Sequence, residues 1–549
     1  MLRLSELKLP LDHGDNALQD AVLKRLRIAP DQLLEQRLVK RSVDARHRDR
    51  IQLIYSIDVR VKGEAALLRR IGNKAKVRPA PDTRYRYVGQ AQAGFPETAE
   101  HRPVVVGAGP CGYFAALLLA QMGFRPLLLE RGEAVKQRTL QTFAFWRGEK
   151  TLDPESNAQF GEGGAGTFSD GKLYSQVSDP EHYGRKVLEE LVASGANDEI
   201  LTLHRPHIGT FKLATVVRGL RARIEALGGE VRFNSRVEML RIEPGAGEKP
   251  YQLVGLDLAG GEHIACRHLV LAPGHSARDC FAMLQRIGVA LERKPFSVGV
   301  RIEHPQGLID AARWGEAAGH PRLGAAEYKL VHHAENGRCV YSFCMCPGGL
   351  VVGATSAEGR AVTNGMSQHS RNERNANSGL VVNLEPEDLA PFEAFPGDPL
   401  AGVGLQRALE EQAFRLGGST YAAPAQRLED FLAGRPSTSL GAIPASYQPG
   451  IHPGDLSALL PLPITQALKE ALPAFARKLK GYDHPDAVIT GVEARTSSPV
   501  RIPRDGDLES RNVQGLVPAG EGAGYAGGIL SAGIDGIRAA EAVAHQLLA

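Results

Sequence analysis

The segment PVVVGAGPCGYFAALLLAQMGFRPLLLER, residues 103–131, constrains the fold more than any other feature of this chain. A valine run, a glycine turn, an apolar helical stretch and a second apolar run predict a strand, a helix and a parallel strand. Gly107, Gly109 and Gly112 have the spacing G-x-G-x-x-G. The first allows a tight bend, the second lets backbone approach a pyrophosphate, and the third lets the helix pack closely. The segment therefore predicts a dinucleotide-binding, Rossmann-like unit.

An acidic residue ends the second strand of this unit. Glu130 follows Gly109 by 21 residues, which is where an acid accepts hydrogen bonds from the adenosine ribose hydroxyls. An acid at this position also repels a 2′-phosphate, so the pattern disfavours NADP. FAD and NAD both remain compatible with this half of the motif.

The far C-terminus favours FAD. Residues 515–548 predict a strand, an acid at Glu521, a turn rich in glycine and a long helix. NAD does not need a second glycine–acid turn at the opposite end of a chain, whereas FAD has a ribityl chain and an isoalloxazine ring to hold. We expect Glu521 to bind a ribityl hydroxyl. The helix that begins near Gly528 is expected to direct its free N–H groups and positive dipole end at the N1/O2 edge of the ring.

Length and composition bound the rest of the molecule. A chain of 549 residues predicts two to four domains, and 61 glycines without collagen periodicity fit tight turns and phosphate-binding loops. The six cysteines form no framework of spaced pairs, so we expect reduced thiols and a cytoplasmic protein. We expect neither export nor a membrane span, because no signal-peptide pattern and no window of about 18 apolar residues occurs.

The predicted fold class is α/β, with five segments. They are a small basic α+β domain (1–90), a linker (91–102), a first part of the FAD-binding domain (103–285), an inserted α+β substrate or cap domain (286–484) and a second part of the FAD-binding domain (485–549). The first 100 residues hold 20 Lys and Arg against 13 Asp and Glu, so the N-terminal domain is the basic part of a chain whose net charge is +3.

The sequence resembles the glutathione-reductase-type FAD superfamily, in the branch with a single dinucleotide fold that includes fumarate-reductase-like flavoproteins. More specifically, it resembles a bacterial group of FAD-dependent dehydrogenases of unassigned substrate. The resemblance covers nearly the whole chain and rests on FGEGGAGTFSDGKL (160–173), LAPGHSARD (271–279), KPFSVGVRIEHPQ (294–306), YSFCMCPGG (341–349), NGMS (364–367), NAN (375–377), APAQRLEDFL (423–432), GVEARTSSPVR (491–501) and PAGEGAGYAGGI (518–529).

This resemblance implies non-covalently bound FAD and an oxidoreductase activity, but it does not identify the substrate. It places the glycine-rich turn 161–172 against the pyrophosphate and isoalloxazine, and Val237 where such folds bind adenine through the main chain. The residues expected to contact FAD are Gly107, Gly109, Pro110, Cys111, Gly112, Glu130, Arg131, Gly163, Gly164, Ala165, Gly166, Val237, Ala272, Gly274, Gly520, Glu521, Gly527, Gly528 and Ile529.

The sequence departs from the disulfide reductases of that superfamily. Those enzymes carry a redox cysteine pair after their first strands and a second G-x-G-x-x-G for NAD(P)H, whereas Cys111 stands alone and no second strand–glycine–helix unit is found. Disulfide reduction by that scheme is therefore not expected. Electrons come from the substrate, a partner protein, or a nicotinamide bound without its own Rossmann module.

Three residues are candidates for catalysis. Lys172 places a cation near the flavin or a substrate carboxylate, or is a surface lysine in a turn. Arg495 binds a substrate carboxylate or phosphate, or forms a structural pair with Glu493. His275 acts as a general acid, although a histidine that satisfies turn backbone is the better interpretation.

The pair Cys344 and Cys346 leaves several alternatives open. Alternation places both thiols on one strand face, where they contact the flavin, form a strained disulfide, or join His332 and His333 in a metal site. The fourth alternative is a pair of buried reduced thiols. We expect buried reduced thiols and no metal site, because no second C-x-x-C or H-x-x-H motif accompanies them.

The basic stretch KRSVDARHRDR, residues 40–50, raises a non-enzymatic alternative. It is compatible with a flavin-containing RNA-modifying protein or a protein-docking module. Aromatic residues for base stacking are sparse in this region, so nucleic acid is not expected. We expect the domain to pack against the FAD domain or a protein partner, with an unidentified small molecule as substrate.

Overall fold

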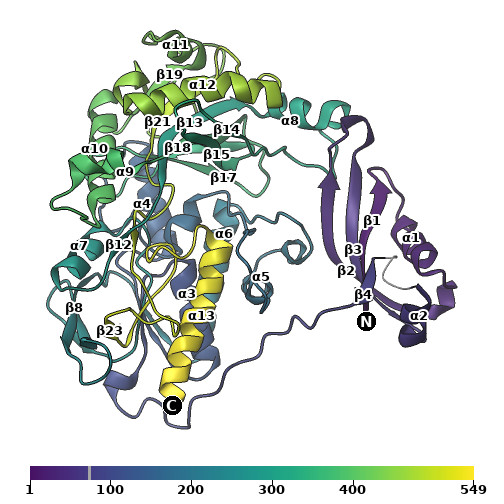
Figure 1. Cartoon of the computed structure of the whole chain (residues 1–549), viewed down its shortest axis with the longest axis horizontal. Helices are drawn as coiled ribbons and strands as arrows, with labels where there is room; N and C mark the ends of the chain where they lie inside the picture. Colours follow the sequence, from purple (N-terminus) through teal and green to yellow (C-terminus); the bar gives the residue numbers. More distant parts are fainter. Residues whose placement is uncertain (72–75) are drawn as a thin grey trace.

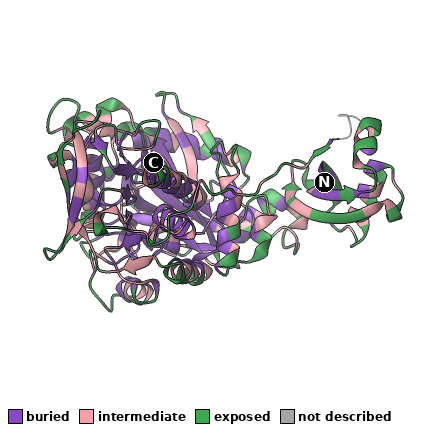
Figure 2. Ribbon diagram, turned by 90° about the horizontal axis from the view of Figure 1, so that it is seen from below, coloured by how far each residue is buried: buried purple, intermediate pink, exposed green. Residues whose placement is uncertain are grey.

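The computed structural model of the chain describes residues 1–71 and 76–549, and Figure 1 shows a large body with a small N-terminal domain beside it. Figure 2 shows that buried residues fill the large body and also the interior of the N-terminal domain. The buried residues of the N-terminal domain belong to the same hydrophobic cluster as those of the inserted domain. In the described part of the chain, no helix is long and apolar enough to cross a membrane.

A five-stranded parallel sheet forms the centre of the Rossmann-like domain. Its order is β24-β11-β5-β6-β7, and every neighbouring pair is parallel. The strands are β5 (Val104–Val106), β6 (Leu127–Leu129), β7 (Glu230–Arg232), β11 (Leu269–Leu271) and β24 (Leu516–Pro518). The continuous Val and Leu runs fit strands that are covered on both faces. The predicted strand–helix–strand unit is confirmed, with α3 (Pro110–Gln121) between β5 and β6.

Helix α13 (Ile529–Leu548) packs along α3, so the two ends of the Rossmann-like domain lie side by side. Small residues allow this contact, because a Cβ at Gly536 would collide with the Cys111 carbonyl. The other helices of this domain are α4 (Val135–Trp146), α5 (Tyr183–Ala193), α6 (Thr210–Ala226) and α7 (Arg278–Arg286). A second sheet joins β8 (Val237–Pro244), β9 (Tyr251–Leu258), β10 (His263–Ala265) and β23 (Val513–Gln514).

The inserted domain is built on a seven-stranded sheet of order β14-β15-β18-β13-β21-β19-β20. Its strands are β13 (Ser297–Pro305), β14 (Val331–His333), β15 (Cys339–Cys346), β18 (Asn375–Asn383), β19 (Ala423–Arg427), β20 (Ile451–Pro453) and β21 (Val488–Glu493). Strand β21 lies beyond residue 484 yet pairs with both β13 and β19. The hydrogen-bonded ladder therefore carries the inserted domain past its predicted limit, to Glu493.

Helices and short strands complete the inserted domain. The helices are α8 (Gln306–Trp314), α9 (Pro386–Leu389), α10 (Ala401–Leu416), α11 (Leu428–Ala433) and α12 (Leu462–Lys478). β16 (Gly349–Gly353) pairs with β17 (Thr363–Ser367). Where the chain enters and leaves the inserted domain, β12 (Glu292–Arg293) pairs with β22 (Val500–Arg501).

The N-terminal domain is the predicted α+β unit. Strands β1 (Leu2–Pro10), β2 (Leu33–Asp44), β3 (Gln52–Val61) and β4 (Val77–Pro79) form one sheet, with helices α1 (Ala17–Leu26) and α2 (Glu64–Ile71). The segment that follows β4 has no helix or strand until a short 3-10 turn at Ala99–His101, so the connection begins about ten residues before the predicted position 91.

The N-terminal domain contacts both other domains. The Arg322 side chain of the inserted domain donates to the Leu11 carbonyl over 2.8 Å. The Arg41 N–H donates to the Thr202 carbonyl over 2.7 Å, and the His204 N–H donates to the Arg41 carbonyl over 2.9 Å. Backbone hydrogen bonds thereby join the edge strand β2 to the Rossmann-like domain. Of the two predicted alternatives, the FAD domain or a protein partner, the structure shows the first.

Candidate functional site

One cleft of about 1080 Å³ lies where the three domains meet. It opens at the carboxyl ends of β5, β6, β11 and β24, which is the edge where open α/β sheets bind their ligands. The volume exceeds the 300–1,000 Å³ typical of small-molecule sites, so it has room for a cofactor together with a substrate. Of the residues predicted from sequence, all line this cleft except Gly112 and Gly163.

The first glycine turn has the geometry that its spacing predicts. Gly107 has a φ of 99°, and a Cβ there would collide with the Ala272 carbonyl. A Cβ at Gly112 would collide with the Gly107 carbonyl, so this glycine serves helix packing and does not face the cleft. A Cβ at Gly109 would have only the Gly164 Cα within 4 Å, at 3.9 Å. Gly109 therefore presents bare backbone to the cleft, at the N-terminus of α3.

Glu130 lies in the cleft wall but has partners that the sequence did not predict. Its carboxylate accepts hydrogen bonds from the N–H groups of Ala108 (2.8 Å), Gly132 (3.0 Å) and Gly161 (2.9 Å). The side chain is 5% exposed. It therefore fixes the two glycine turns relative to each other, and its predicted contact with the ribose stays a prediction.

The C-terminal turn closes the other side of the cleft. A Cβ at Gly527 or Gly528 would meet no atom within 4 Å, so backbone is bare there too, directly before helix α13. Burial raises the pKa of Glu521 to about 7, although the Lys294 ammonium opposes this shift. A carboxyl group in this state can donate or accept a hydrogen bond near neutral pH.

These features fit FAD. Two helix N-termini, of α3 and α13, reach one cleft from opposite ends of the chain. A side chain at Gly109, Gly274, Gly527 or Gly528 would occupy the open space of that cleft. N-terminal N–H groups without helical acceptors are suited to phosphates and to the electron-rich edge of a flavin. The residues present can therefore hold the dinucleotide and the ring of FAD in one continuous groove.

Lys172 is held in the cleft by an ion-pair network. Its Nζ lies 3.8 Å from Asp170 Oδ2, and Arg371 of the inserted domain binds the same carboxylate through two nitrogens, at 2.9 and 2.5 Å. Burial lowers the pKa of Lys172, but the negative charges around it, of which Asp170 contributes most, together raise the pKa. Lys172 therefore keeps its charge although its side chain is only 17% exposed.

The surroundings of Arg495 and His275 do not fit the catalytic roles predicted for them. Arg495 is held by Glu410 at 2.8 Å through two nitrogens and donates to Ser276 and Ser356. Glu493, its expected structural partner, binds Arg301 instead. With its donors engaged, Arg495 is better suited to holding the cleft wall than to capturing a substrate.

His275 is neutral near pH 7. Burial, with the nearby charges of Arg495 and Arg278, lowers its pKa to about 3. An imidazole that is deprotonated under working conditions does not supply a proton as an imidazolium, so the general-acid prediction is not supported by the electrostatics of this site. The alternative of a histidine that satisfies turn backbone fits better.

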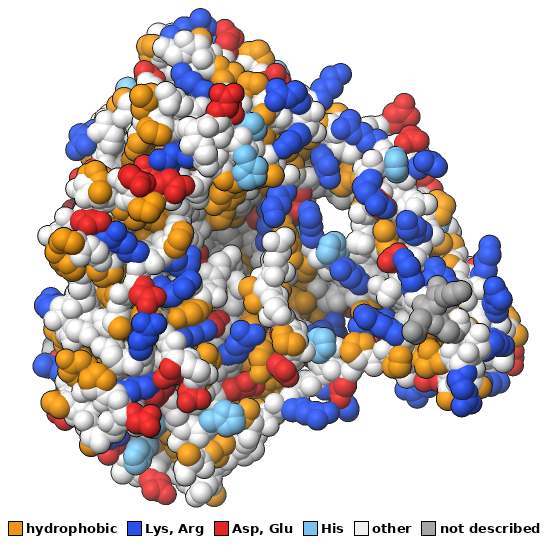
Figure 3. Space-filling view, viewed as in Figure 1, with side chains coloured by type: hydrophobic (Ala, Val, Ile, Leu, Met, Phe, Trp, Pro, Cys, Tyr) orange, Lys and Arg blue, Asp and Glu red, His pale blue; other side chains and the backbone are white. Residues whose placement is uncertain are grey.

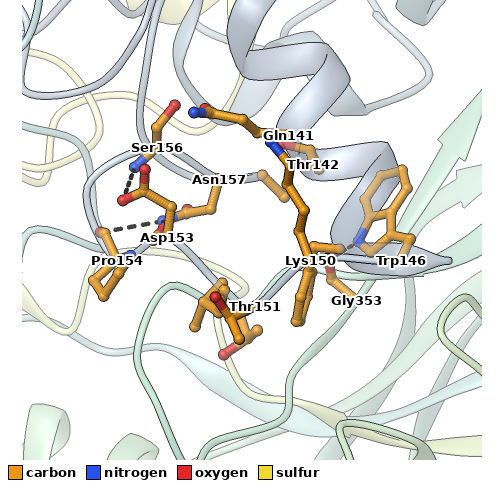
Figure 4. A pocket seen from close by; sticks show the side chains of 14 residues that line it. Gln141, Thr142, Trp146, Lys150, Thr151, Asp153, Pro154, Ser156, Asn157 and Gly353 are labelled. Carbon is orange, nitrogen blue, oxygen red and sulfur yellow. Dashed lines mark hydrogen bonds between the residues drawn. The ribbon is translucent and has the colours of Figure 1, made fainter. Parts of the chain in front are cut away.

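A second, smaller cavity of about 500 Å³ lies beside α4. Figure 4 shows Gln141, Thr142 and Trp146 of that helix around it, together with Lys150 and Asp153 of the loop that follows. The Trp146 indole donates to the Gly353 carbonyl over 2.8 Å. No helix N-terminus and no run of glycines lines this cavity in the described part of the chain, so it lacks the features that fit FAD.

The mouth of the large cleft is lined by basic side chains. Lys40 reaches it from the N-terminal domain, and Lys172, Arg205 and Lys329 line it from the other domains. Figure 3 shows Lys and Arg side chains gathered around the opening between the N-terminal domain and the large body. Part of the basic stretch 40–50 thus faces the cleft instead of forming an independent surface.

Comparisons with known proteins agree with this architecture. Residues 295–496 match the family described as "FAD-dependent protein, C-terminal domain-like", residues 101–296 match "Pyridine nucleotide-disulphide oxidoreductase", and residues 1–60 match a domain of unknown function. A protein of Clostridium beijerinckii, described as uncharacterized, is 45% identical over 547 residues, which are 99% of each chain. The chain belongs to the same family as this clostridial protein. It is an FAD-dependent oxidoreductase.

Two solved structures are also similar to the chain. Quinol fumarate reductase FrdA of E. coli is 13% identical, with a TM-score of 0.36 over 81% of this chain and 70% of that one. The 3-ketosteroid-delta4-(5alpha)-dehydrogenase of Rhodococcus jostii is 13% identical, with a TM-score of 0.33 over 83% of this chain and all of that one.

Sequence reasoning missed several residues of the site. Arg371 binds Asp170 from 201 positions away, and Glu410 binds Arg495 from 85 positions away. Lys40 enters the cleft from another domain. The local spacing of the sequence carries no signal for these contacts, because each depends on how the domains pack.

Proposed function

We propose that this enzyme moves an electron pair between FAD and an anionic organic substrate that enters through the basic mouth of the cleft. Bound FAD supplies the two-electron chemistry at its isoalloxazine ring. The observation that carries the proposal is the one-sided charge of that mouth, where Lys40, Lys172, Arg205 and Lys329 stand against Asp170 and Glu327.

Both acidic residues of the mouth are paired with cations. Arg371 pairs with Asp170 and also with Glu327, at 2.9 Å. Lys172 also lies 3.8 Å from Asp170, and Arg205 lies 3.7 Å from Glu327. With Arg371, five cations therefore face two carboxylates, and a carboxylate or phosphate would supply part of the missing negative charge. Lys172 is the best placed of them, because its stem is held in the cleft wall and its charge is retained.

The proposed roles of the chain's own residues follow from their positions. Lys172 binds and orients the anionic group, while Lys40 and Lys329 attract it to the opening. The N-terminal domain narrows the entrance through its backbone bonds to Thr202 and His204, which reduces the access of water. We also propose a cytoplasmic location, which the six free thiols support.

The test is a binding titration of the holoprotein, monitored by the change in the flavin absorbance spectrum. The probes are mono- and dicarboxylates and organic phosphates, each paired with its uncharged amide or ester. We expect the anionic members to bind at least tenfold more tightly, and Lys172→Gln to lose about 1.5–3 kcal/mol of that binding. Lys136→Gln is the matched control, because Lys136 is exposed on α4 outside the cleft. Equal binding of anions and their neutral analogues would refute the proposal.

A further inference from the structure

The two cysteines of strand β15 lie at a β-bulge. Phe343 pairs with Gly379 and Cys346 pairs with Asn377, so three steps along β15 match two steps along β18. Cys344 lies within this bulge. Its φ is 42°, in the left-handed region that non-glycine residues rarely adopt. Bulges re-aim side chains and occur preferentially next to active sites.

The spacing of the two cysteines is compatible with a disulfide. In a regular strand a rise of about 3.3 Å per residue separates residues i and i+2 by about 6.6 Å, close to the upper limit of about 6.8 Å for bridged cysteines. The Cys346 thiol donates to the Cys344 carbonyl over 3.4 Å, so the second sulfur is turned back toward the first cysteine. Cys344 lines the cleft, while Cys346 lies behind it with no exposed surface. One sulfur is therefore accessible from the cleft and the other is shielded.

The surroundings favour a thiolate at Cys344. A hydrogen bond from the Cys346 thiol lowers the pKa of Cys344, and the charges of Lys172 and Arg301 add to this effect against the opposing effect of burial. Arg301 also donates to the Cys344 carbonyl over 3.3 Å. A cysteine with a lowered pKa, accessible from a cleft and next to a second cysteine, has the features of a redox-active thiol.

Cys344 lies near both segments that are expected to hold the flavin, the C-terminal turn and the turn 161–172. Its charge raises the pKa of Glu521, in the C-terminal turn, and of Lys172, in the turn 161–172. Lys172, Cys344 and Glu521 also line the same cleft. Cys344 therefore lies in the part of the cleft that is bounded by the two turns expected to hold the flavin ring.

We propose that Cys344 and Cys346 form a dithiol that closes to a disulfide by passing two electrons to the bound FAD. The Sγ–Sγ bond forms as the S–H bond of Cys346 breaks. The thiolate and the thiol together lose two electrons and one proton, and oxidised FAD accepts all three, so no other reactant is needed. The inference rests on FAD being bound in this cleft, and it extends the enzyme's electron storage beyond the flavin.

The test is an anaerobic dithionite titration of the air-oxidised holoprotein, monitored by flavin absorbance. A disulfide adds a second two-electron acceptor to each chain, so the wild type is expected to consume about twice as many reducing equivalents per FAD as Cys344→Ser or Cys346→Ser. Cys280→Ser is the matched control, because Cys280 also lines the cleft but burial raises its pKa. It is expected to titrate like the wild type. Equal consumption by the wild type and Cys344→Ser would overturn the proposal.

A second measurement needs neither variant to fold. Oxidised wild-type holoprotein is alkylated with iodoacetamide, digested with trypsin and examined by mass spectrometry of the peptide 339–360. We expect Cys344 and Cys346 to be joined and unmodified, and to become alkylated after reduction. Finding both as alkylated thiols in the fully oxidised protein would also overturn the proposal. The FAD content, measured on the cofactor released by denaturation, separates a failure of the cysteine couple from a failure to bind FAD.

Discussion

Replacing Gly109 by valine tests whether bare backbone at the start of α3 binds the cofactor. Gly109 has a φ of −76° and a ψ of −179°, which valine adopts without strain. A Cβ there would meet only the Gly164 Cα, at 3.9 Å. The folded chain can therefore accommodate the side chain, and the methyl groups would extend into the cleft where a pyrophosphate approaches.

The expected loss follows from the bonds that the side chain blocks. A hydrogen bond between backbone N–H and a charged phosphate contributes about 1.5–3 kcal/mol, so losing one weakens FAD binding by about 10- to 150-fold. The assay is the titration of apoprotein with FAD, followed by the quenching of flavin fluorescence. The melting temperature of the apoprotein should change little.

Two further glycine variants make the result specific. Gly307→Val is the matched control, because a Cβ at Gly307 also meets no atom within 4 Å but lies in α8, outside the cleft. It should bind FAD like the wild type. Gly112→Ala should fail to fold, since its Cβ would collide with the Gly107 carbonyl. Wild-type affinity of Gly109→Val for FAD would refute the assignment of this turn to the pyrophosphate.

Three other predictions concern charge. The folded apoprotein holds a proton on Glu521 up to about pH 7, whereas the unfolded chain releases it near pH 4.3, so stability falls as pH rises between these values. In urea unfolding, the wild type should lose up to about 3 kcal/mol of unfolding free energy between pH 5 and pH 8 because of Glu521, and Glu521→Gln should not show this loss. The same pH dependence in both proteins would contradict the raised pKa. Arg495→Met should cost about 3 kcal/mol of unfolding free energy by breaking its bonds to Glu410; full stability with lost substrate binding would instead favour a direct substrate contact. Single-stranded RNA should bind no more tightly than about 10⁻⁴ to 10⁻⁶ M at physiological salt, which fluorescence anisotropy measures, and a nanomolar complex lost on removing residues 1–95 would reverse that expectation.

The parts of the fold that depend on local spacing were predictable. The strand, glycine turn and helix around Gly107 follow from steric limits within a dozen residues, and they occur as expected. The same reasoning identified Gly528 before α13, because a helix N-terminus and its preceding glycine are neighbours in sequence.

Features that depend on packing were not predictable in the same way. The sequence indicated that Arg495 and Glu493 share a strand side, but the two belong to different ion pairs with Glu410 and Arg301. Strand β21 fell outside the predicted inserted domain because its partners lie far away in sequence. Only the assembled sheets determine which of several possible partners each group reaches.

The same limit explains Glu130. Its spacing from Gly109 predicted a ribose ligand, and the residue does line the cleft. The spacing could not indicate that three backbone N–H groups, including that of Gly161, would converge on its carboxylate. That convergence depends on the turn 161–172 folding back against the first turn.

The crystal structure of the holoprotein with FAD is the most direct test of this account. We predict that the diphosphate lies against the N-terminus of α3 at Gly109, and that the isoalloxazine lies between Lys172 and Gly528, with Cys344 facing the same part of the cleft. Cofactor density in the reverse orientation, or in the cavity beside α4, would contradict the account.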